Sequence, residues 1–181
     1  MDMTTSRVSA RVAPVSAAAA FLAFALAACG PVPAPSESAT PNRAGLVIVH
    51  SAGEVVRACV EFREASISGE ELLGRAGFAV ELDEANPMGS LVCSIAGEGC
   101  DVPAEPCLCR CLGPGTCAYW AYFQRDPEAG WIYSAQGARA RMVRHGDLDG
   151  WVWLTSAGPA GAEAAAGPLQ EFRFADVCPG P

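Results

Sequence analysis

The sequence contains no lysine, so arginine supplies all twelve of its basic side chains, against twenty aspartate and glutamate residues. The formal net charge is −8 at pH 7, and the arginines are scattered along the chain instead of forming a stripe. Nucleic-acid binding depends on clustered positive charge that neutralises phosphates. The composition therefore predicts no nucleic-acid partner, and it disfavours adsorption to anionic lipid beyond a covalent anchor.

Groups that perform catalysis are also few. There are two histidines, His50 and His145, and neither lies in a recognisable nucleophile–base motif. Paired carboxylates occur only in predicted caps and turns, where such groups commonly stabilise the backbone. The stretch Asp147-Leu-Asp-Gly150 matches a fragment of a calcium loop without its distal glutamate. We therefore predict that the chain is not an enzyme and holds no cofactor or metal.

A long hydrophobic run is missing as well. The apolar stretch from Val15 to Ala28 is shorter than the roughly 20 residues that a membrane-spanning helix needs. It follows two arginines, Arg7 and Arg11, and has the length of the hydrophobic region of a signal peptide. We therefore predict that residues 1–28 are a signal peptide that is removed.

The end of this stretch reads Leu26-Ala27-Ala28-Cys29, followed by Gly30, and it resembles the lipobox of bacterial lipoproteins. The resemblance implies that Cys29 becomes the first residue of the mature protein and carries lipid. Its acyl chains would hold the protein at a membrane surface, since each buried CH₂ contributes about 0.8 kcal/mol. The predicted location is the cell envelope, extracytoplasmic and lipid-anchored. An ordinary cleaved signal followed by a chance cysteine is the alternative.

Residues 29–44 are rich in proline and serine and contain no large aromatic side chain. Such a stretch has few backbone donors and cannot form a core, so it is predicted to be an extended tether. The remaining residues, 45–178, are enough for one domain with a single core.

Nine cysteines are present, and removing Cys29 leaves an even number. An even cysteine count outside the cytoplasm indicates a disulfide framework. Six of the eight lie between Cys93 and Cys117, in a segment rich in proline and glycine. This pattern predicts an inserted loop at 97–117 that is held by cross-links. The eight predicted disulfide cysteines are Cys59, Cys93, Cys100, Cys107, Cys109, Cys111, Cys117 and Cys178.

Eight cysteines allow 105 pairings. We favour Cys59 with Cys178, which would attach the C-terminal tail to an early strand. The alternative for the C-x-C-x-C segment at Cys107–Cys111 is metal binding or thiol exchange. Zinc sites usually pair cysteines at gaps of two to four residues, with a second pair farther along the chain. The cysteines of this segment are separated by single residues, so we expect disulfides.

The pattern of the domain predicts two strands, one helix and then several strands. Ser68 and Glu71 form a capping box at the start of the helix, and Gly77 ends it. This order predicts an α+β fold, a small β-grasp-like mixed sheet with one short helix and a disulfide-rich inserted loop. The Ala/Gly/Pro-rich residues 155–170 are predicted to be a flexible loop. Strands are predicted at 46–49, 55–62, 78–82, 90–95, 118–123, 131–133, 151–154 and 171–174.

Aromatic residues on the later strands are the candidate ligand-binding residues. One short helix cannot cover both faces of a sheet, so we expect some of these rings to remain exposed as a stacking platform. The alternative is that they form the core of a small β-rich domain. The candidates are Trp120, Tyr122, Trp131, Tyr133, Trp151 and Trp153.

The region from about Leu46 to Leu154 resembles the C-terminal domain of transcobalamin and intrinsic factor. The matching pieces are the first hairpin, the helix at 68–76, Phe78, the strand at 91–97, Tyr119-Trp120, Trp131-Ile-Tyr133, Gly137, Gly146-Asp147 and Trp151. The sequence departs from the family in its cysteine-rich insertion and in lacking the partner helical domain. Because cobalamin lies between the two domains in those carriers, the resemblance implies the fold better than the ligand.

Two functions follow as expectations. The first is non-catalytic binding of a soluble ligand, such as a corrinoid, that is handed to a membrane transporter. The second is a surface module, stabilised by disulfides, that binds another protein or a glycan.

Overall fold

A computed structural model of the chain describes residues 40–87, 89–112, 116–156 and 163–180. The predicted signal peptide, Cys29 and most of the predicted tether lie outside these residues. No helix in the described ranges is long and apolar enough to cross a membrane. The elements are β1 Asn42–Val49, β2 Val55–Phe62, β3 Ile67–Ser68, α1 Gly69–Arg75, β4 Val80–Asp83, β5 Leu91–Ile95, β6 Glu98–Gly99, η1 Cys109–Cys111, β7 Cys117–Asp126, β8 Gly130–Tyr133, β9 Met142–Val143, β10 Leu148–Ser156, η3 Glu163–Leu169 and α2 Phe174–Val177.

The largest sheet has five strands in the order β2-β1-β10-β7-β8. β1 and β10 are parallel at its centre, while β1–β2, β10–β7 and β7–β8 are antiparallel. The first hairpin therefore lies at one side and the aromatic strands at the other. The α+β class predicted from the sequence is confirmed.

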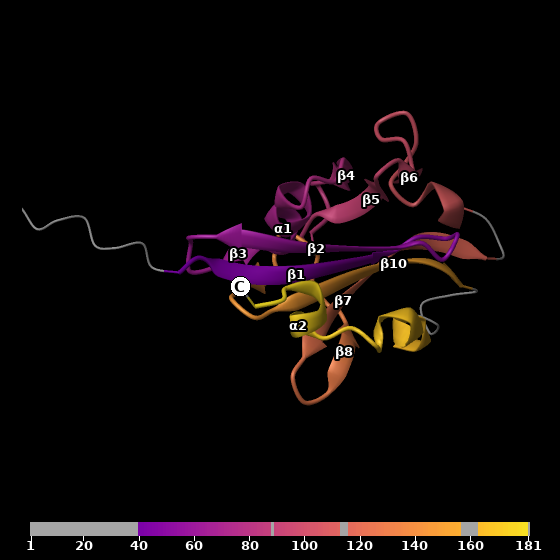
Figure 1. Ribbon diagram of the computed structural model, residues 1–181. Coiled ribbons are helices and arrows are strands. Elements are labelled where there is room, and N and C mark those ends of the chain that lie inside the picture. The colour runs from indigo at the N-terminus through magenta and orange to yellow at the C-terminus, as the bar shows by residue number, and fades with distance from the viewer. Residues whose placement is uncertain (1–39, 88, 113–115, 157–162, 181) are drawn as a thin grey trace, which may run out of the picture. The chain divides into compact units, whose positions relative to one another are not determined.

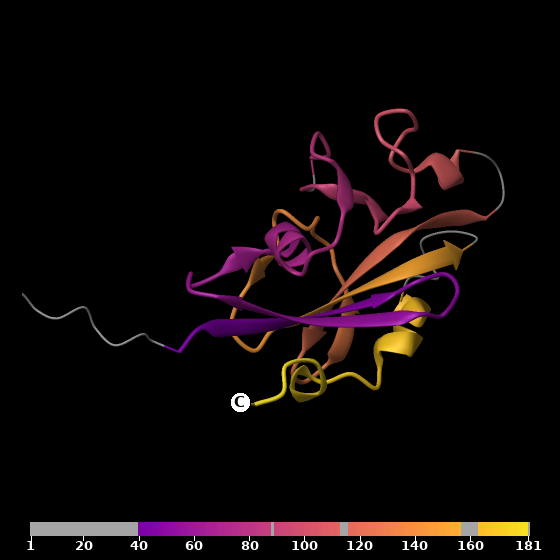
Figure 2. The same ribbon diagram turned by 45° about the horizontal axis from the view of Figure 1, so that its top comes forward.

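Smaller elements cover both faces of this sheet (Figures 1 and 2). α1 and the short strands β3 to β6 lie over one face, and η3 and α2 lie over the other. β3 pairs with β9, and β4, β5 and β6 form a three-stranded sheet. The central sheet is thus the middle layer of three.

Alternation along the strands divides the buried side chains into two cores. Leu46, Ile48 and Trp120 face α1 and pack with Leu72 and Leu73 of that helix. The opposite side chains of the same strands, among them Val47, Ala121 and Phe123, pack with Ala166, Leu169, Phe172 and Val177.

The helix begins as the sequence predicts. Ser68 Oγ accepts a hydrogen bond from Glu71 N at 3.1 Å, and Glu71 Oε2 accepts one from Ser68 N at 2.8 Å. Gly77, just beyond the helix, has a φ of +86°. A residue with a Cβ adopts this left-handed conformation with difficulty, which explains why the helix ends at a glycine.

All eight predicted cysteines form disulfides. The pairs are Cys59–Cys178, Cys93–Cys107, Cys100–Cys109 and Cys111–Cys117. The first is the pair favoured from the sequence, and it joins β2 to the residue after α2. The other three cross-link the cysteine-rich segment to itself, to β5 and to the start of β7. A disulfide-rich domain is compatible with an extracytoplasmic location.

The C-terminal region differs from the sequence-based expectation. At 171–174, where an edge strand is predicted, the described chain has no strand: η3 ends at Leu169 and the second helix, α2, begins at Phe174. Within the region predicted to be a flexible loop, Ala166 and Leu169 are buried in the core. The sheet presents an apolar second face that these residues cover, and no periodic pattern in the Ala/Gly-rich sequence indicates this. Residues 157–162 of that region lie outside the described residues.

Several strand boundaries also differ from the predicted ones, and two of the differences affect the assignment of residues. β1 begins at Asn42, so the sheet includes residues that were assigned to the tether. β10 begins at Leu148, which places Asp149 inside a central strand instead of in a turn.

Candidate ligand-binding cleft

A cleft of about 460 Å³ opens between β5, the face of β7 that is turned toward α1 and the residues that follow β8. Four of the six aromatic residues that are predicted to contact a ligand line this cleft. These are Trp120, Tyr122, Tyr133 and Trp151. None of the described residues that line it is charged. The lining is mainly aromatic and aliphatic, and we name it the aromatic cleft.

The other two candidates lie elsewhere. Trp153 is half-buried beside Trp120, with ring centroids 5.4 Å apart, and does not line the cleft. Trp131 is buried on the opposite face of the sheet. The six aromatic residues therefore do not form one platform, and Trp120, Tyr122 and Trp151 are mostly buried walls instead of exposed surfaces.

Trp120 is held in place on several sides. Its indole Nε1 donates to the carbonyl oxygen of Glu98 at 2.7 Å, and the His50 ring contacts it edge-on at 5.4 Å. His50 Nδ1 lies 2.6 Å from Glu98 Oε2. β6 and the end of β1 thus fix this wall of the cleft.

Tyr122 connects the cleft to a buried carboxylate. Its ring stacks on Trp151 with centroids 4.2 Å apart and an interplanar angle of 7°. Its hydroxyl donates a hydrogen bond to Asp149 Oδ2, and Asp149 is fully buried. Burial raises the pKa of Asp149 to about 6, although Arg141 acts in the opposite direction. Burial and the nearby Asp149 carboxylate raise the pKa of Tyr122 well above its usual value.

Arg141 completes this network. Its Nη2 lies 2.9 Å from Asp147 Oδ2 and 3.5 Å from Asp149 Oδ1. A buried carboxylate is tolerated when it is paired and hydrogen-bonded, and here Tyr122 and Arg141 meet that need. The position of Tyr122 in the cleft wall thus depends on its hydrogen bond to Asp149 and on the pairing of Asp149 with Arg141.

A second cleft of about 420 Å³ adjoins the first and has a more polar lining. The two share the segment 133–136, which follows β8. Arg125, Asp126, Arg141 and Asp147 contribute to its walls. We name it the polar cleft.

Three buried side-chain donors have no hydrogen-bond partner among the described residues. They are the Nε1 atoms of Trp131 and Trp151 and the Nε atom of Arg141. Buried donors are nearly always satisfied, so each exception calls for an explanation. Trp151 contributes to the lining of the aromatic cleft and Arg141 to that of the polar cleft, but the unpartnered nitrogen atom of each is itself buried.

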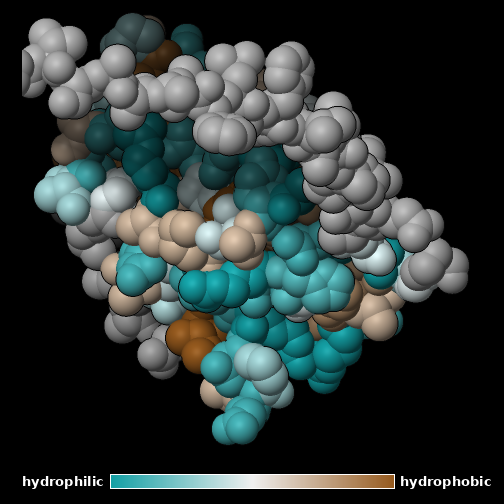
Figure 3. Space-filling view, turned by 90° about the vertical axis from the view of Figure 1, so that its left-hand side faces the viewer, coloured by the Kyte–Doolittle hydropathy of each residue, from teal (hydrophilic) through white to brown (hydrophobic). Residues whose placement is uncertain are grey.

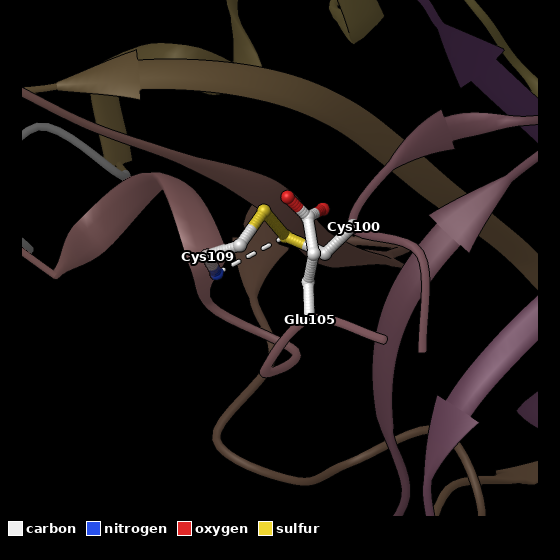
Figure 4. Close-up of side chains that lie close together, drawn as sticks. All are labelled: Cys100, Glu105 and Cys109. Atoms are coloured by element: carbon white, nitrogen blue, oxygen red, sulfur yellow. Dashed lines mark hydrogen bonds between the residues drawn. A yellow bond between two sulfur atoms is a disulfide. The ribbon is translucent and has the colours of Figure 1, made fainter. Parts of the chain in front are cut away.

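The sequence left metal binding by the C-x-C-x-C segment open. Donor atoms of Cys100, Glu105 and Cys109 lie within 4.8 Å of one another. Figure 4 shows, however, that the two sulfur atoms are bonded to each other, with the Glu105 carboxylate beside them. A thiolate is the form that ligates a metal, so this oxidised group offers one carboxylate and no thiolate.

Comparison with known proteins adds little. No protein-family model and no curated protein sequence matches this chain. One solved structure, described as "a putative metal binding protein" from Ruminococcus gnavus, aligns over 65% of this chain and 98% of its own, at 13% identity and a TM-score of 0.40. This similarity is too weak to carry an argument about function.

Sequence reasoning identified the aromatic residues, Tyr133 among them, but missed the burial of Asp149, the role of Arg141 and the cleft residues 134–136. Asp149 stands next to Gly150 in a stretch that reads as a turn. The parallel pairing of β1 with β10 buries it, and the sequence carries no local signal of that pairing.

Proposed function

We propose that this chain is an extracytoplasmic, non-catalytic binding protein, and that the aromatic cleft is its ligand site. The observation that carries the proposal is the cleft itself, where four aromatic side chains predicted as ligand contacts line one cavity. Its volume of about 460 Å³ lies within the range of about 300–1,000 Å³ that is usual for small-molecule sites.

The chemistry of the walls defines the class of ligand. A charged ligand would lose its hydration in this cleft without meeting an opposite charge, and such a transfer is costly. A flat, uncharged group would instead stack against the indole and phenol rings. The proposed ligand is therefore uncharged and aromatic or otherwise planar in the part that enters the cleft.

The proposal includes attachment to a membrane through lipid on Cys29. The four disulfides and the lipobox-like motif support an extracytoplasmic, anchored protein. The test is the intact mass of the mature protein in the membrane fraction, for the wild type and for Cys29→Ser. A mature wild-type chain that begins elsewhere, or that carries no lipid, would contradict the anchor.

Within this class a corrinoid that is passed to a membrane transporter remains our first candidate. Its support is the sequence resemblance stated above. A whole cobalamin is much larger than a drug-sized ligand, so the cleft would hold only part of one.

The binding test uses the full secreted chain with its disulfides intact. Tryptophan fluorescence is followed while cobalamin, a simpler corrinoid and neutral naphthalene derivatives are added. Saturable quenching is expected for at least one of them, and Trp151→Phe should weaken it. Trp131→Phe is the matched control, because Trp131 is also a buried indole and lies on the other face of the sheet. If no compound binds, or if both variants respond alike, the cleft is not the site.

A second function is favoured by the cysteine-rich segment. Leu112, next to η1, is 72% exposed, and Leu108 is also exposed. Apolar side chains on a rigid, cross-linked segment are suited to a protein contact. A Leu112→Asp variant should then lose a partner that the wild type recovers from envelope extracts, while small-molecule binding stays unchanged.

A further inference from the structure

We propose that the free edge of β2 is an interaction surface, and that a second copy of this chain pairs with it as an antiparallel strand. The large sheets of the two copies would then be continuous across their β2 strands. This inference stands apart from the proposed function, because no residue of β2 lines the aromatic cleft.

β2 is the longer of the two edge strands of the large sheet. It has eight residues, stands at one end of the strand order and pairs with β1 alone. β8, at the other end, has four residues. Among the described residues, no backbone hydrogen bond reaches β2 from an element other than β1. A long edge with unpaired backbone groups is a template for a further strand.

The pairing of β1 shows which backbone groups of β2 face outward. Gly45 N donates to the carbonyl oxygen of Asp147, so Gly45 faces β10 and its two neighbours along β1 face β2. His50 N donates to the carbonyl oxygen of Glu54, which continues the same alternation into the hairpin. The N–H and C=O groups of one residue point to the same side of a strand, and successive residues alternate. The exposed residues of β2 that face away from β1 are therefore Val55, Arg57, Cys59 and Glu61.

The charges on this edge favour one register. In an antiparallel pair centred on Cys59, Arg57 of each copy lies opposite Glu61 of the other, and the two Cys59 residues lie opposite each other. Each of these pairs exchanges two N–H···O bonds, because all of the residues face outward. Opposite charges directly across two strands stabilise the pairing. A pair centred on Arg57 or on Glu61 would instead place like charges opposite each other.

Both charged side chains are available for this contact. Neither Arg57 nor Glu61 has an ion-pair partner in the part of the chain that the structure describes. The Arg57 guanidinium lies 5.7 Å from the centre of the Phe172 ring, on the face of the sheet that η3 and α2 cover. Alternation places Glu61 on the same face. Cys59 is bonded to Cys178 of its own chain, so the pairing involves no disulfide between copies.

The contact should depend on concentration. The face at which β1 begins is turned toward the viewer in Figure 3 and is largely hydrophilic, with small separate hydrophobic spots. Interfaces of permanent homodimers are more apolar than this. Backbone hydrogen bonds and the two charge pairs would therefore supply the contact, against the mutual repulsion of chains with a formal charge of −8.

Sedimentation equilibrium of the full oxidised chain tests the inference at concentrations up to about 1 mM, the effective concentration that a short tether provides. The wild type should change from monomer to dimer within this range. Arg57→Glu and Glu61→Arg each place like charges at both charge pairs, so each should raise the dissociation constant of the dimer by about tenfold or more.

Glu128→Arg is the matched control for Glu61→Arg. Glu128 is exposed in the turn between β7 and β8, at the other edge of the sheet, and its replacement changes the net charge by the same amount. This variant should dimerise at least as well as the wild type, because it only reduces the repulsion between acidic chains.

Two further samples test the register. In a mixture of Arg57→Glu with Glu61→Arg, each glutamate at the contact again faces an arginine, so the mixture should form a heterodimer. The doubly substituted chain, which keeps the original net charge, should recover the homodimer. Local damage caused by either substitution would not be reversed in this way.

Thermal unfolding of each variant shows whether it is folded. A wild type that stays monomeric up to about 1 mM would overturn the inference. A dimer that survives both single substitutions, or a doubly substituted chain that is folded and monomeric, would overturn it as well. None of these results bears on the aromatic cleft, whose ligand is tested separately.

Discussion

Asp149 should make the protein less stable as the pH rises from about 4 to about 6. Its pKa is raised from 3.8 to about 6, mainly by burial. In this window the folded chain retains a proton that the unfolded chain has released, so the free energy of unfolding falls with rising pH. At about 1.4 kcal/mol per pH unit, the interval corresponds to roughly 3 kcal/mol.

The variant Asp149→Asn isolates this contribution, because asparagine has a similar shape and does not titrate. Urea unfolding of the oxidised wild type and variant is followed by tryptophan fluorescence between pH 3.5 and 8. The free energy of unfolding of the wild type minus that of the variant should decrease by roughly 3 kcal/mol across the window and then level off. Contributions from carboxyl groups that do not interact with Asp149 cancel in this difference, whereas that of Asp147, which acts on the pKa of Asp149, does not.

Glu64→Gln provides the contrasting control. The hydrogen bond from Arg75 is the largest cause that lowers the pKa of Glu64, to about 2. A lowered pKa has the opposite sign, since its stabilisation is present above the unfolded pKa and is lost as the pH falls. If the Asp149 difference rises with pH as the Glu64 difference does, or stays flat, the assignment of a buried carboxyl with a raised pKa is wrong.

Four further predictions concern other parts of the chain. Replacing Cys59 and Cys178 together by serine should lower the free energy of unfolding by about 2–4 kcal/mol in urea titrations, because the bond closes a loop over 119 positions. Leu169→Ala should cost about 2–5 kcal/mol in the same assay, and a negligible loss would show that η3 is not part of the core. Gly137→Ala places a Cβ 2.7 Å from the backbone carbon of Gly89, so it should displace this side of the aromatic cleft and weaken naphthalene binding, while the melting temperature shows whether the variant is folded. Cys29→Ser should move the protein from the membrane fraction to the soluble fraction, as detected by immunoblotting.

Features encoded locally could be predicted from the sequence. The first hairpin follows from alternation in Val55–Phe62, and the start of α1 follows from Ser68 and Glu71 three residues apart. The α+β class follows from the order of these elements. The disulfide framework follows from cysteine count and context, although the Cys59–Cys178 pair was one choice among many.

Features that depend on distant parts of the chain could not be predicted. The second core forms because Ala166 and Leu169 meet the far face of the sheet, and their own neighbourhood has no amphipathic period. The aromatic cleft joins Ser90, Tyr122 and Gln136, which are separated by many residues. The sequence could show which aromatic side chains were candidates for ligand contact, but it could not show which of them share a cavity.

The position of β1 between two neighbouring strands has a mechanical consequence. β1 is the first strand of the described chain, and it pairs with β2 over Asn42–Val49 on one side and with β10 over Gly45–Val49 on the other. A pull applied at its N-terminal end runs along the strand axis, so the two ladders must yield together in shear instead of opening one bond at a time. Arg43, near the start of β1, also donates to the carbonyl oxygen of Pro179 at 2.7 Å, beside the disulfide at Cys178. A domain held by its N-terminal end would therefore resist unfolding by a force applied where the chain enters the sheet.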